Sequence, residues 1–413
     1  MEIAIGLAGI AVILALAVLF STDRRRIRLR VVAPAFALQA AIAVLVLYVP
    51  AGRAAIATLA RGVEQLLGYS RAGIEMVFGG LTEVNGVASL AINILPIIIF
   101  FSALVSVLYF FGIMQRVVRY GGGLLQRVLG VHRVEGLFAA ANVLVGQSES
   151  PLVVRGYLRA LTDAQLFALM VIGMAGVAGS ILAAYAQMGV RIEYLLAAAF
   201  MSAPGGLLMA KLLMPDPPGA PSETPAVTQP LVDEEERPSN LFMAIFQGTE
   251  DGVKLAVSVA AMLVVFVALI ALCNGILGGI AGLFGAPGLT LQQILGWVFA
   301  PLMFLLNVPW SEAGRAGELF GEKLILNEFV AYLHFGPTRD TLSPHTQAVV
   351  TFALCGFANI SSIAIQMGVL GGLVPERRAT VARLGPRALF AASLANLMSA
   401  ALAGLILTAG GLT

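Results

Sequence analysis

Residues 143–151 read Val-Leu-Val-Gly-Gln-Ser-Glu-Ser-Pro, which places an amide, two hydroxyls and a carboxylate inside otherwise apolar sequence. Residues 324–330, Leu-Ile-Leu-Asn-Glu-Phe-Val, repeat that arrangement in the second half of the chain. A carboxylate inside a lipid bilayer is costly unless it is paired or solvated, so acids in such surroundings are candidates for function. Glu149 and Glu328 therefore mark two functional segments of a membrane protein.

The composition of the whole chain supports a membrane protein. Its 413 residues are 59% hydrophobic and 12% charged, whereas soluble domains carry about 25% charged residues. This composition excludes a soluble enzyme, a nucleic-acid-binding protein and a disordered chain. The two cysteines and three histidines have neither disulfide nor metal-site spacing, so we expect no resident cofactor.

The apolar runs predict an all-α polytopic membrane protein with eight transmembrane helices. The predicted spans are residues 3–20, 31–49, 90–114, 166–188, 194–214, 255–280, 348–373 and 388–409. The first run is a span rather than a signal peptide, because its arginines follow it instead of preceding it. Basic groups after the first span, after the third and before the eighth then all lie in the cytoplasm, with both termini outside.

The segments between the spans complete this prediction. Residues 132–160 and 310–335 are apolar but carry polar clusters, and each starts and ends on one side of the membrane. They are predicted to be two oppositely oriented re-entrant hairpins, entering from the cytoplasm and from outside. Residues 50–65 predict an amphipathic helix on the outer surface, and the acidic, proline-rich residues 215–240 a disordered linker.

The chain also contains an inverted repeat, formed by residues 132–214 and 310–409. Each half has a hairpin with a polar tip, followed by a span that glycines and polar residues interrupt, at 173–180 and at 356–362. Paired interruptions of this kind in inverted halves indicate the substrate site of a secondary transporter. Structural roles remain open at this point: Glu149 could pair with Arg155, and Glu328 with Lys323, while Asn359 could simply join helices.

Three motifs resemble those of the concentrative nucleoside transporter family, over nearly the whole chain. They are residues 146–152, Gly-Gln-Ser-Glu-Ser-Pro-Leu; residues 327–332, Asn-Glu-Phe-Val-Ala-Tyr; and residues 355–364, Cys-Gly-Phe-Ala-Asn-Ile-Ser-Ser-Ile-Ala. The resemblance implies a homotrimer in which each protomer has scaffold and transport domains. Residues 1–114 and 241–290 would form the scaffold, 115–214 and 291–413 the two halves of the transport domain, and 215–240 a cytoplasmic linker.

The resemblance also implies the roles of individual residues. Nucleobase binding would fall to Gln147, Ser148, Glu149 and Ile181, ribose binding to Glu328, Asn359 and Ser362, and a pocket wall to Phe357. A carboxylate can accept hydrogen bonds from the vicinal hydroxyls of a ribose, which agrees with this assignment.

The coupling ion follows from the resemblance as well. Sodium would be held by the Asn142 side chain and by backbone carbonyls near Val145 and Val177. The family also places a serine hydroxyl in this site, where the present sequence has Gly176. Proton coupling is therefore the alternative.

The function that we expect is uptake of nucleosides such as uridine, by ion-coupled symport with alternating access across a bacterial inner membrane. A channel is less well supported, because the polar residues form isolated clusters rather than a continuous pore. A membrane-embedded enzyme would need a nucleophile–base pair or a metal cluster, and neither tip contains a histidine or a cysteine.

Overall fold

The computed structural model describes residues 2–84, 87–88, 90–217, 238–285 and 288–411. Apart from one pair of two-residue antiparallel strands, β1 (Glu83–Val84) and β2 (Val87–Ala88), the regular structure of these residues is helical. The predicted all-α membrane fold is thus confirmed at this level. Most of the predicted linker, residues 218–237, lies outside the described residues.

The helices follow one another along the chain, many of them separated by only a few residues. They are α1 (Glu2–Leu19), η1 (Arg24–Arg26), α2 (Leu29–Leu47), α3 (Pro50–Phe78), η2 (Gly79–Thr82), α4 (Leu90–Phe110), α5 (Ile113–Leu129), α6 (Arg133–Val145), α7 (Ser150–Val153), η3 (Arg155–Ala160), α8 (Asp163–Ala175), α9 (Gly179–Gln187), α10 (Ile192–Leu213), α11 (Leu241–Gly282), α12 (Leu291–Leu305), α13 (Trp310–Ile325), α14 (Glu328–Thr338), η5 (Arg339–Thr341), α15 (Pro344–Leu354), α16 (Ile360–Leu373), η6 (Pro375–Arg377) and α17 (Arg378–Ala409).

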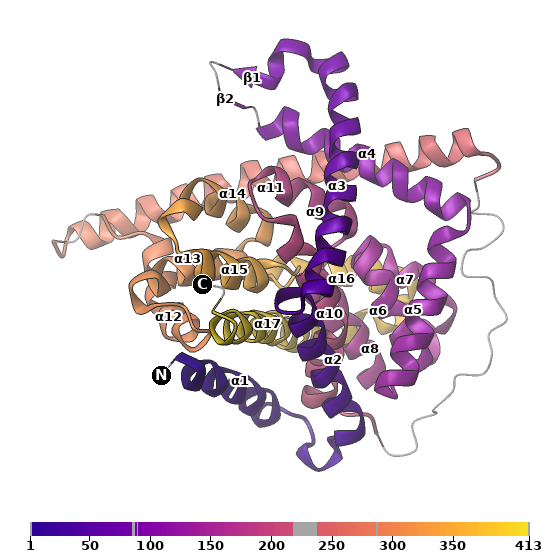
Figure 1. Cartoon of the computed structure of the whole chain (residues 1–413), viewed down its shortest axis with the longest axis horizontal. Helices are drawn as coiled ribbons and strands as arrows, with labels where there is room; N and C mark the ends of the chain where they lie inside the picture. Colours follow the sequence, from indigo (N-terminus) through magenta and orange to yellow (C-terminus); the bar gives the residue numbers. More distant parts are fainter. Residues whose placement is uncertain (1, 85–86, 89, 218–237, 286–287, 412–413) are drawn as a thin grey trace.

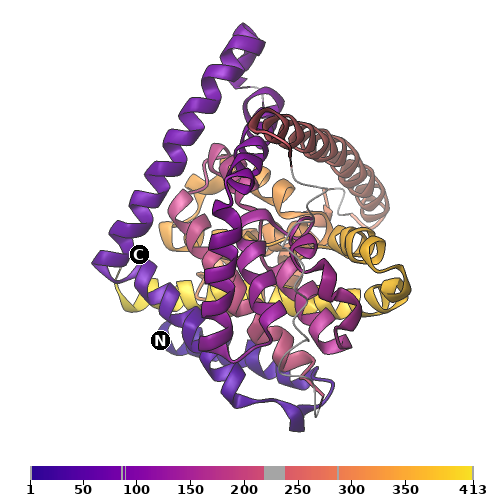
Figure 2. The same cartoon turned by 90° about the vertical axis from the view of Figure 1, so that its right-hand side faces the viewer.

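Three helical segments form the centre of the molecule: the α8–α9 pair, α10 and α17, which pack on one another. The buried share of the apolar stretch is 89% in α8–α9, 89% in α10 and 78% in the segment that contains α17. In α11 it is 11%. Figures 1 and 2 show α11 and the far part of α3 standing away from this packed body. The central helices can therefore hold a site inside the protein, and α11 presents its apolar side chains outward.

Seven helical segments of the described chain are long and apolar enough to cross a membrane, or up to eight if one bent pair counts as a span. That bent pair is α12 and α13, whose axes differ by 118°. The helix α12 was not anticipated from the sequence. Its start is fixed by a capping box in which Thr290 and Gln293 satisfy each other's backbone N–H groups, a short polar signal between two apolar runs.

Two central segments are broken, and both breaks lie where glycines interrupt the predicted spans. The helix α8 ends at Ala175 and α9 begins at Gly179, while α15 ends at Leu354 and α16 begins at Ile360. The predicted surface helix at residues 50–65 is longer than expected, because α3 continues to Phe78. A break in a buried helix leaves backbone groups that need partners, and these groups shape the site below.

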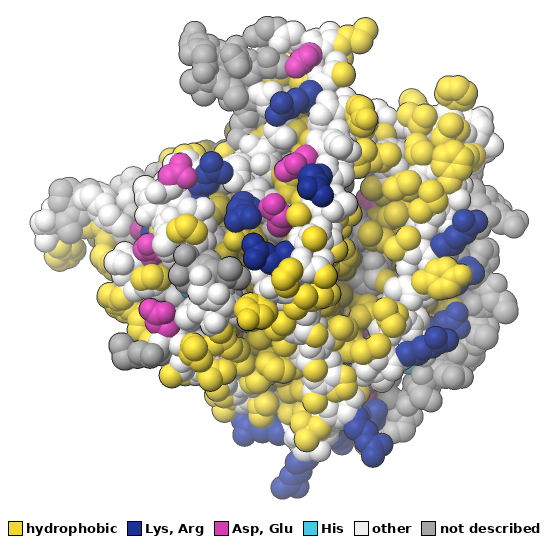
Figure 3. All heavy atoms as spheres, viewed as in Figure 1, with side chains coloured by type: hydrophobic (Ala, Val, Ile, Leu, Met, Phe, Trp, Pro, Cys, Tyr) yellow, Lys and Arg dark blue, Asp and Glu magenta, His cyan; other side chains and the backbone are white. Residues whose placement is uncertain are grey.

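The surface carries broad apolar areas, which Figure 3 shows in yellow. Lysine and arginine side chains gather along the right-hand edge of this view, over α5, and at its lower end, near the connection between α1 and α2. Basic side chains at the rim of an apolar surface are typical of proteins that lie in a bilayer.

Candidate functional site

The first polar tip lies at the end of α6. That helix stops at Val145 because Gly146 adopts a φ of 79°, a conformation that costs a glycine little and other residues more. The side chain of Gln147 is buried, whereas those of Ser148 and Glu149 are exposed. The tip therefore points one amide into the protein and a hydroxyl and a carboxylate outward.

The second polar tip lies between α13 and α14. The side chain of Asn327 caps α14 by accepting a hydrogen bond from the Val330 N–H at 2.9 Å, as an N-cap residue does. This cap fixes Glu328 as the first residue of α14, with only 4% of it exposed. A buried carboxylate at a helix N-terminus is favourably placed with respect to the helix dipole.

The break between α15 and α16 supplies the partners of Glu328. Asn359 caps α16 through the Ser362 N–H at 2.9 Å, and its Nδ2 donates to Glu328 Oε2 at 3.1 Å. The other carboxylate oxygen accepts a hydrogen bond from the Tyr185 hydroxyl of α9 at 2.8 Å. Each oxygen of Glu328 thus has a side-chain donor, which fixes the carboxylate and leaves lone pairs for a ligand.

The first tip joins this same network. Gln147 Nε2 donates to Ser362 Oγ at 3.0 Å, and Gln366 Nε2 donates to Gln147 Oε1 at 3.0 Å. Residues from three distant parts of the chain thus meet in one hydrogen-bonded group, which we call the polar cluster: Gln147, Glu328, Asn359 and Ser362.

A cavity of about 930 Å³ adjoins this cluster. Its inner wall includes Gln147, Ser148, Glu149, Ile181 and Phe357. The helices α4, α5 and α11 also line it, with Ser102, Tyr109, Arg116, Arg119 and Asp251 among their residues. The expected nucleobase residues and Phe357 therefore face the cavity. Glu328, Asn359 and Ser362 are each less than 5% exposed and lie behind that wall.

The structural pairings that were left open for the two acids do not form. Among the described residues, no ion pair joins Glu149 to Arg155 or Glu328 to Lys323. Lys323 instead donates to Ala353 O at 2.8 Å and to Asn396 Oδ1 at 2.6 Å. Neither acid is thus held in an ion pair with the partner that the sequence left open for it.

The residues expected to bind an ion also lie close together. Asn142 is 1% exposed and its Nδ2 donates to Ile172 O at 2.9 Å. Its Oδ1 receives only a long contact of 3.5 Å from Ser150 Oγ, whose hydroxyl bonds to Gly146 O at 2.6 Å. Val145, the last residue of α6, and Val177, in the break after α8, are buried as well.

Comparison with known proteins identifies the family. Residues 194–404 match the family model described as "Na+ dependent nucleoside transporter C-terminus", and residues 8–81 match its N-terminal counterpart. Residues 91–191 match a model described as "Nucleoside recognition". The chain belongs to the concentrative nucleoside transporter family. It is a transporter and not an enzyme.

Relatives and solved structures agree with this assignment. The transporter is 48% identical to an "Uncharacterized transporter" of Haemophilus influenzae, over 99% of both chains. It is 43% identical to the "Nucleoside permease NupC" of Helicobacter pylori, over 97% of this chain and 96% of that one. The structure of CNTnw in an inward-facing substrate-bound state has a TM-score of 0.94 and 48% identity, over 100% of this chain and 99% of that one.

Sequence reasoning missed three polar residues of this transporter that contact the site or the residues around it: Tyr185, Gln366 and Asn396. The first two bond directly to the polar cluster. Tyr185 lies in an apolar stretch, where an aromatic residue is typical of packing. Gln366 and Asn396 are single amides in apolar helices, a signal that could have drawn attention to them.

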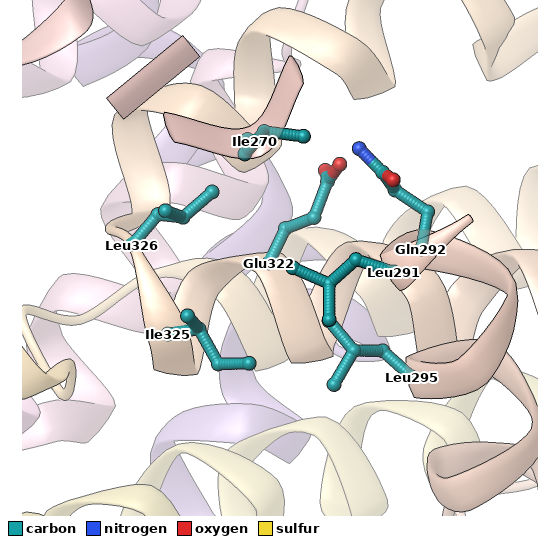
Figure 4. A pocket seen from close by; sticks show the side chains of 7 residues that line it. All are labelled: Ile270, Leu291, Gln292, Leu295, Glu322, Ile325 and Leu326. Atoms are coloured by element: carbon teal, nitrogen blue, oxygen red, sulfur yellow. The ribbon is translucent and has the colours of Figure 1, made fainter. Parts of the chain in front are cut away.

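A second, smaller crevice lies between α11, α12 and α13. Figure 4 shows the Glu322 carboxylate and the Gln292 amide turned toward the same gap among apolar side chains. Both groups already have partners, since His334 Nδ1 lies 3.0 Å from Glu322 Oε1 and Asn274 Nδ2 donates to Gln292 Oε1 at 3.0 Å. We therefore place the functional site at the polar cluster and not in this crevice.

Proposed function

We propose that this transporter is an ion-coupled symporter that imports nucleosides such as uridine across the inner membrane. The observation that carries the proposal is the meeting of both polar tips, Gln147 and Glu328, in one hydrogen-bonded group beside a cavity of about 930 Å³. A cavity of this size is in the usual range for small-molecule sites.

The chemistry of the cluster suits a nucleoside. Glu328 would accept hydrogen bonds from the vicinal ribose hydroxyls, with Asn359 and Ser362 beside it, because a carboxylate binds paired hydroxyl donors well. At the cavity wall, Gln147, Ser148 and Glu149 offer both donors and acceptors to a nucleobase edge. Two side chains, Ile181 and Phe357, would pack against the planar ring.

The arrangement also supports separate transport and scaffold domains. In this proposal, α6–α7 and α13–α14 are the two re-entrant hairpins of a transport domain, and the outlying α3, α4 and α11 belong to a scaffold that forms a homotrimer. The cavity wall includes Arg116 and Arg119, and basic segments lie on the cytoplasmic side. We therefore propose that the cavity opens to the cytoplasm.

We propose sodium as the coupling ion. The Asn142 amide oxygen has no short hydrogen bond from a described residue, and carbonyls at helix breaks are common sodium ligands in transporters. The family leads us to expect a serine at position 176, where this chain has Gly176. A Cβ at Gly176 would lie 3.1 Å from Ser202 Oγ, so the Ser202 hydroxyl of α10 lies near the position of the expected serine. The donor set thus fits a sodium ion.

The test is uptake of labelled uridine into proteoliposomes. Three conditions are compared: an inward sodium gradient, an inward proton gradient with choline replacing sodium, and no gradient. We expect accumulation only with the sodium gradient. Accumulation with protons alone would overturn sodium coupling, and no accumulation under either gradient would overturn nucleoside symport.

A further inference from the structure

The two broken spans meet at their breaks. The Phe357 N–H, in the break after α15, donates to Gly176 O, in the break after α8, at 3.0 Å. The amide of Asn396, on α17, bridges the same two segments: its Nδ2 donates to Ala175 O at 2.7 Å and to Cys355 O at 3.1 Å. The carboxyl ends of two half-helices therefore converge on one buried amide.

Lys323 completes this junction from α13. Its side chain is fully buried, and its Nζ donates to Ala353 O at 2.8 Å and to Asn396 Oδ1 at 2.6 Å. Among the described residues it forms no ion pair with a carboxylate. A buried ammonium without such a partner is unfavourable unless its surroundings are strongly negative, and helix carboxyl ends carry partial negative charge.

The first half of the molecule has an oxygen-lined junction at the corresponding place. There α6 ends at Val145, and Asn142, one turn earlier, faces the break after α8. In the second half α13 ends at Ile325, and Lys323, in its last turn, faces the break after α15. The first junction offers neutral oxygens for a cation, whereas the second already contains the amine of a lysine.

We propose that the Lys323 ammonium is a covalently attached cation at the break after α15. It takes the role there that the coupling ion takes at the break after α8. It neutralises the converging carboxyl ends of the half-helices and holds the break in the shape that presents Asn359 to the ligand. Asn396 is the positioning residue that links it to both breaks. The second half thus needs no mobile ion. This role of the coupling ion rests on the proposed function. The charge requirement at Lys323, which is that the break after α15 needs a positive charge, does not.

The charge requirement can be tested on purified protein without nucleoside. Lys323→Ala removes the ammonium and leaves space, so methylammonium should occupy the gap. Thermal unfolding is measured with rising methylammonium chloride, with choline chloride at equal ionic strength as the reference. We expect a lowered melting temperature for Lys323→Ala that methylammonium raises saturably, and no methylammonium effect on the wild type. The matched control is Lys254→Ala, whose lysine is 65% exposed and should respond to neither salt.

Lys323→Gln separates charge from hydrogen bonding, because its amide can donate but carries no charge. We expect it to resemble Lys323→Ala and to bind uridine about tenfold or more weakly than the wild type. A Lys323→Gln protein with wild-type stability and affinity would overturn the proposal. So would a Lys323→Ala protein whose loss of stability no cation restores.

The wild-type protein provides a measurement that needs no variant. The reversal potential of uridine-coupled current in proteoliposomes gives the charge moved with each nucleoside. We expect one mobile charge per uridine, and two would overturn the proposal. Failure of all uridine transport would refute the proposed function, while the methylammonium experiment would still decide the role of Lys323.

Discussion

At the residue scale, the hydroxyl of Tyr185 is the clearest support of the site. It donates to Glu328 Oε1 at 2.8 Å while its ring packs on Tyr332, with the ring centroids 4.6 Å apart. Tyr185→Phe removes the donor and keeps the ring, so Glu328 loses one of the two side-chain hydrogen bonds that orient it. We expect uridine to bind about tenfold more weakly, as measured by isothermal titration calorimetry.

The control for this prediction is Tyr332→Phe. The hydroxyl of Tyr332 donates to Thr351 O at 2.9 Å and has no hydrogen bond to Glu328. Its removal should lower the melting temperature and leave the affinity for uridine unchanged. Equal effects of the two substitutions on affinity would show that Tyr185 acts only through packing.

Residues such as Tyr185 also show which parts of the site could not be predicted from the sequence. The acids Glu149 and Glu328 were identified because a carboxylate in apolar sequence is unusual. A tyrosine in an apolar helix is ordinary, and only the approach of α9 to α14 turns its hydroxyl into a ligand of Glu328. The same holds for Lys323, which the sequence offered only as an alternative partner of Glu328 and which instead bonds across to α15 and α17.

At the scale of elements, the break after α15 depends on close contact at Gly356. A Cβ there would lie 2.6 Å from Ala175 O and would also meet the amide of Asn396, both closer than a real Cβ tolerates. Gly356→Ala should therefore lower the free energy of unfolding by about 1–3 kcal/mol and weaken uridine binding, because the break carries Asn359. Thermal unfolding and calorimetry measure the two effects.

Gly368→Ala is the matched control within α16. No atom lies within 4 Å of a Cβ at this position, and alanine favours a helix over glycine. This variant should be at least as stable as the wild type. A similar loss in both variants would mean that the packing of the break does not decide its stability.

The sequence predicted the breaks better than it predicted the connections between helices. Glycines and polar residues inside long apolar runs located both interruptions, at 176–178 and 355–359. The helix α12 was missed although a capping box marks its start. Its bend of 118° toward α13 could not be predicted, because it follows from packing between the two helices, which no local pattern encodes. The number of spans and the re-entrant hairpins stay predictions.

At the scale of the whole molecule, the direction in which the cavity opens can be tested by labelling. Ser148 is exposed and lines the cavity, whereas Ser202 is 2% exposed. In a background of Cys273→Ser and Cys355→Ala, Ser148→Cys should react with a membrane-impermeant thiol reagent applied from the cytoplasmic face, and saturating uridine should slow the reaction. Ser202→Cys should not react. Faster labelling of Ser148→Cys from the outer face would contradict the proposed opening.

The assignment of the ribose to Glu328 is the central claim, and a thermodynamic cycle tests it most directly. Calorimetry compares the binding of uridine with that of 2′,3′-dideoxyuridine in the wild type and in Glu328→Gln. The control is Glu376→Gln, because Glu376 forms an exposed ion pair with Arg159. We expect loss of the hydroxyls to weaken binding about 100-fold in the wild type and in the control, and less than about tenfold in Glu328→Gln. An equal penalty in all three proteins would contradict the assignment.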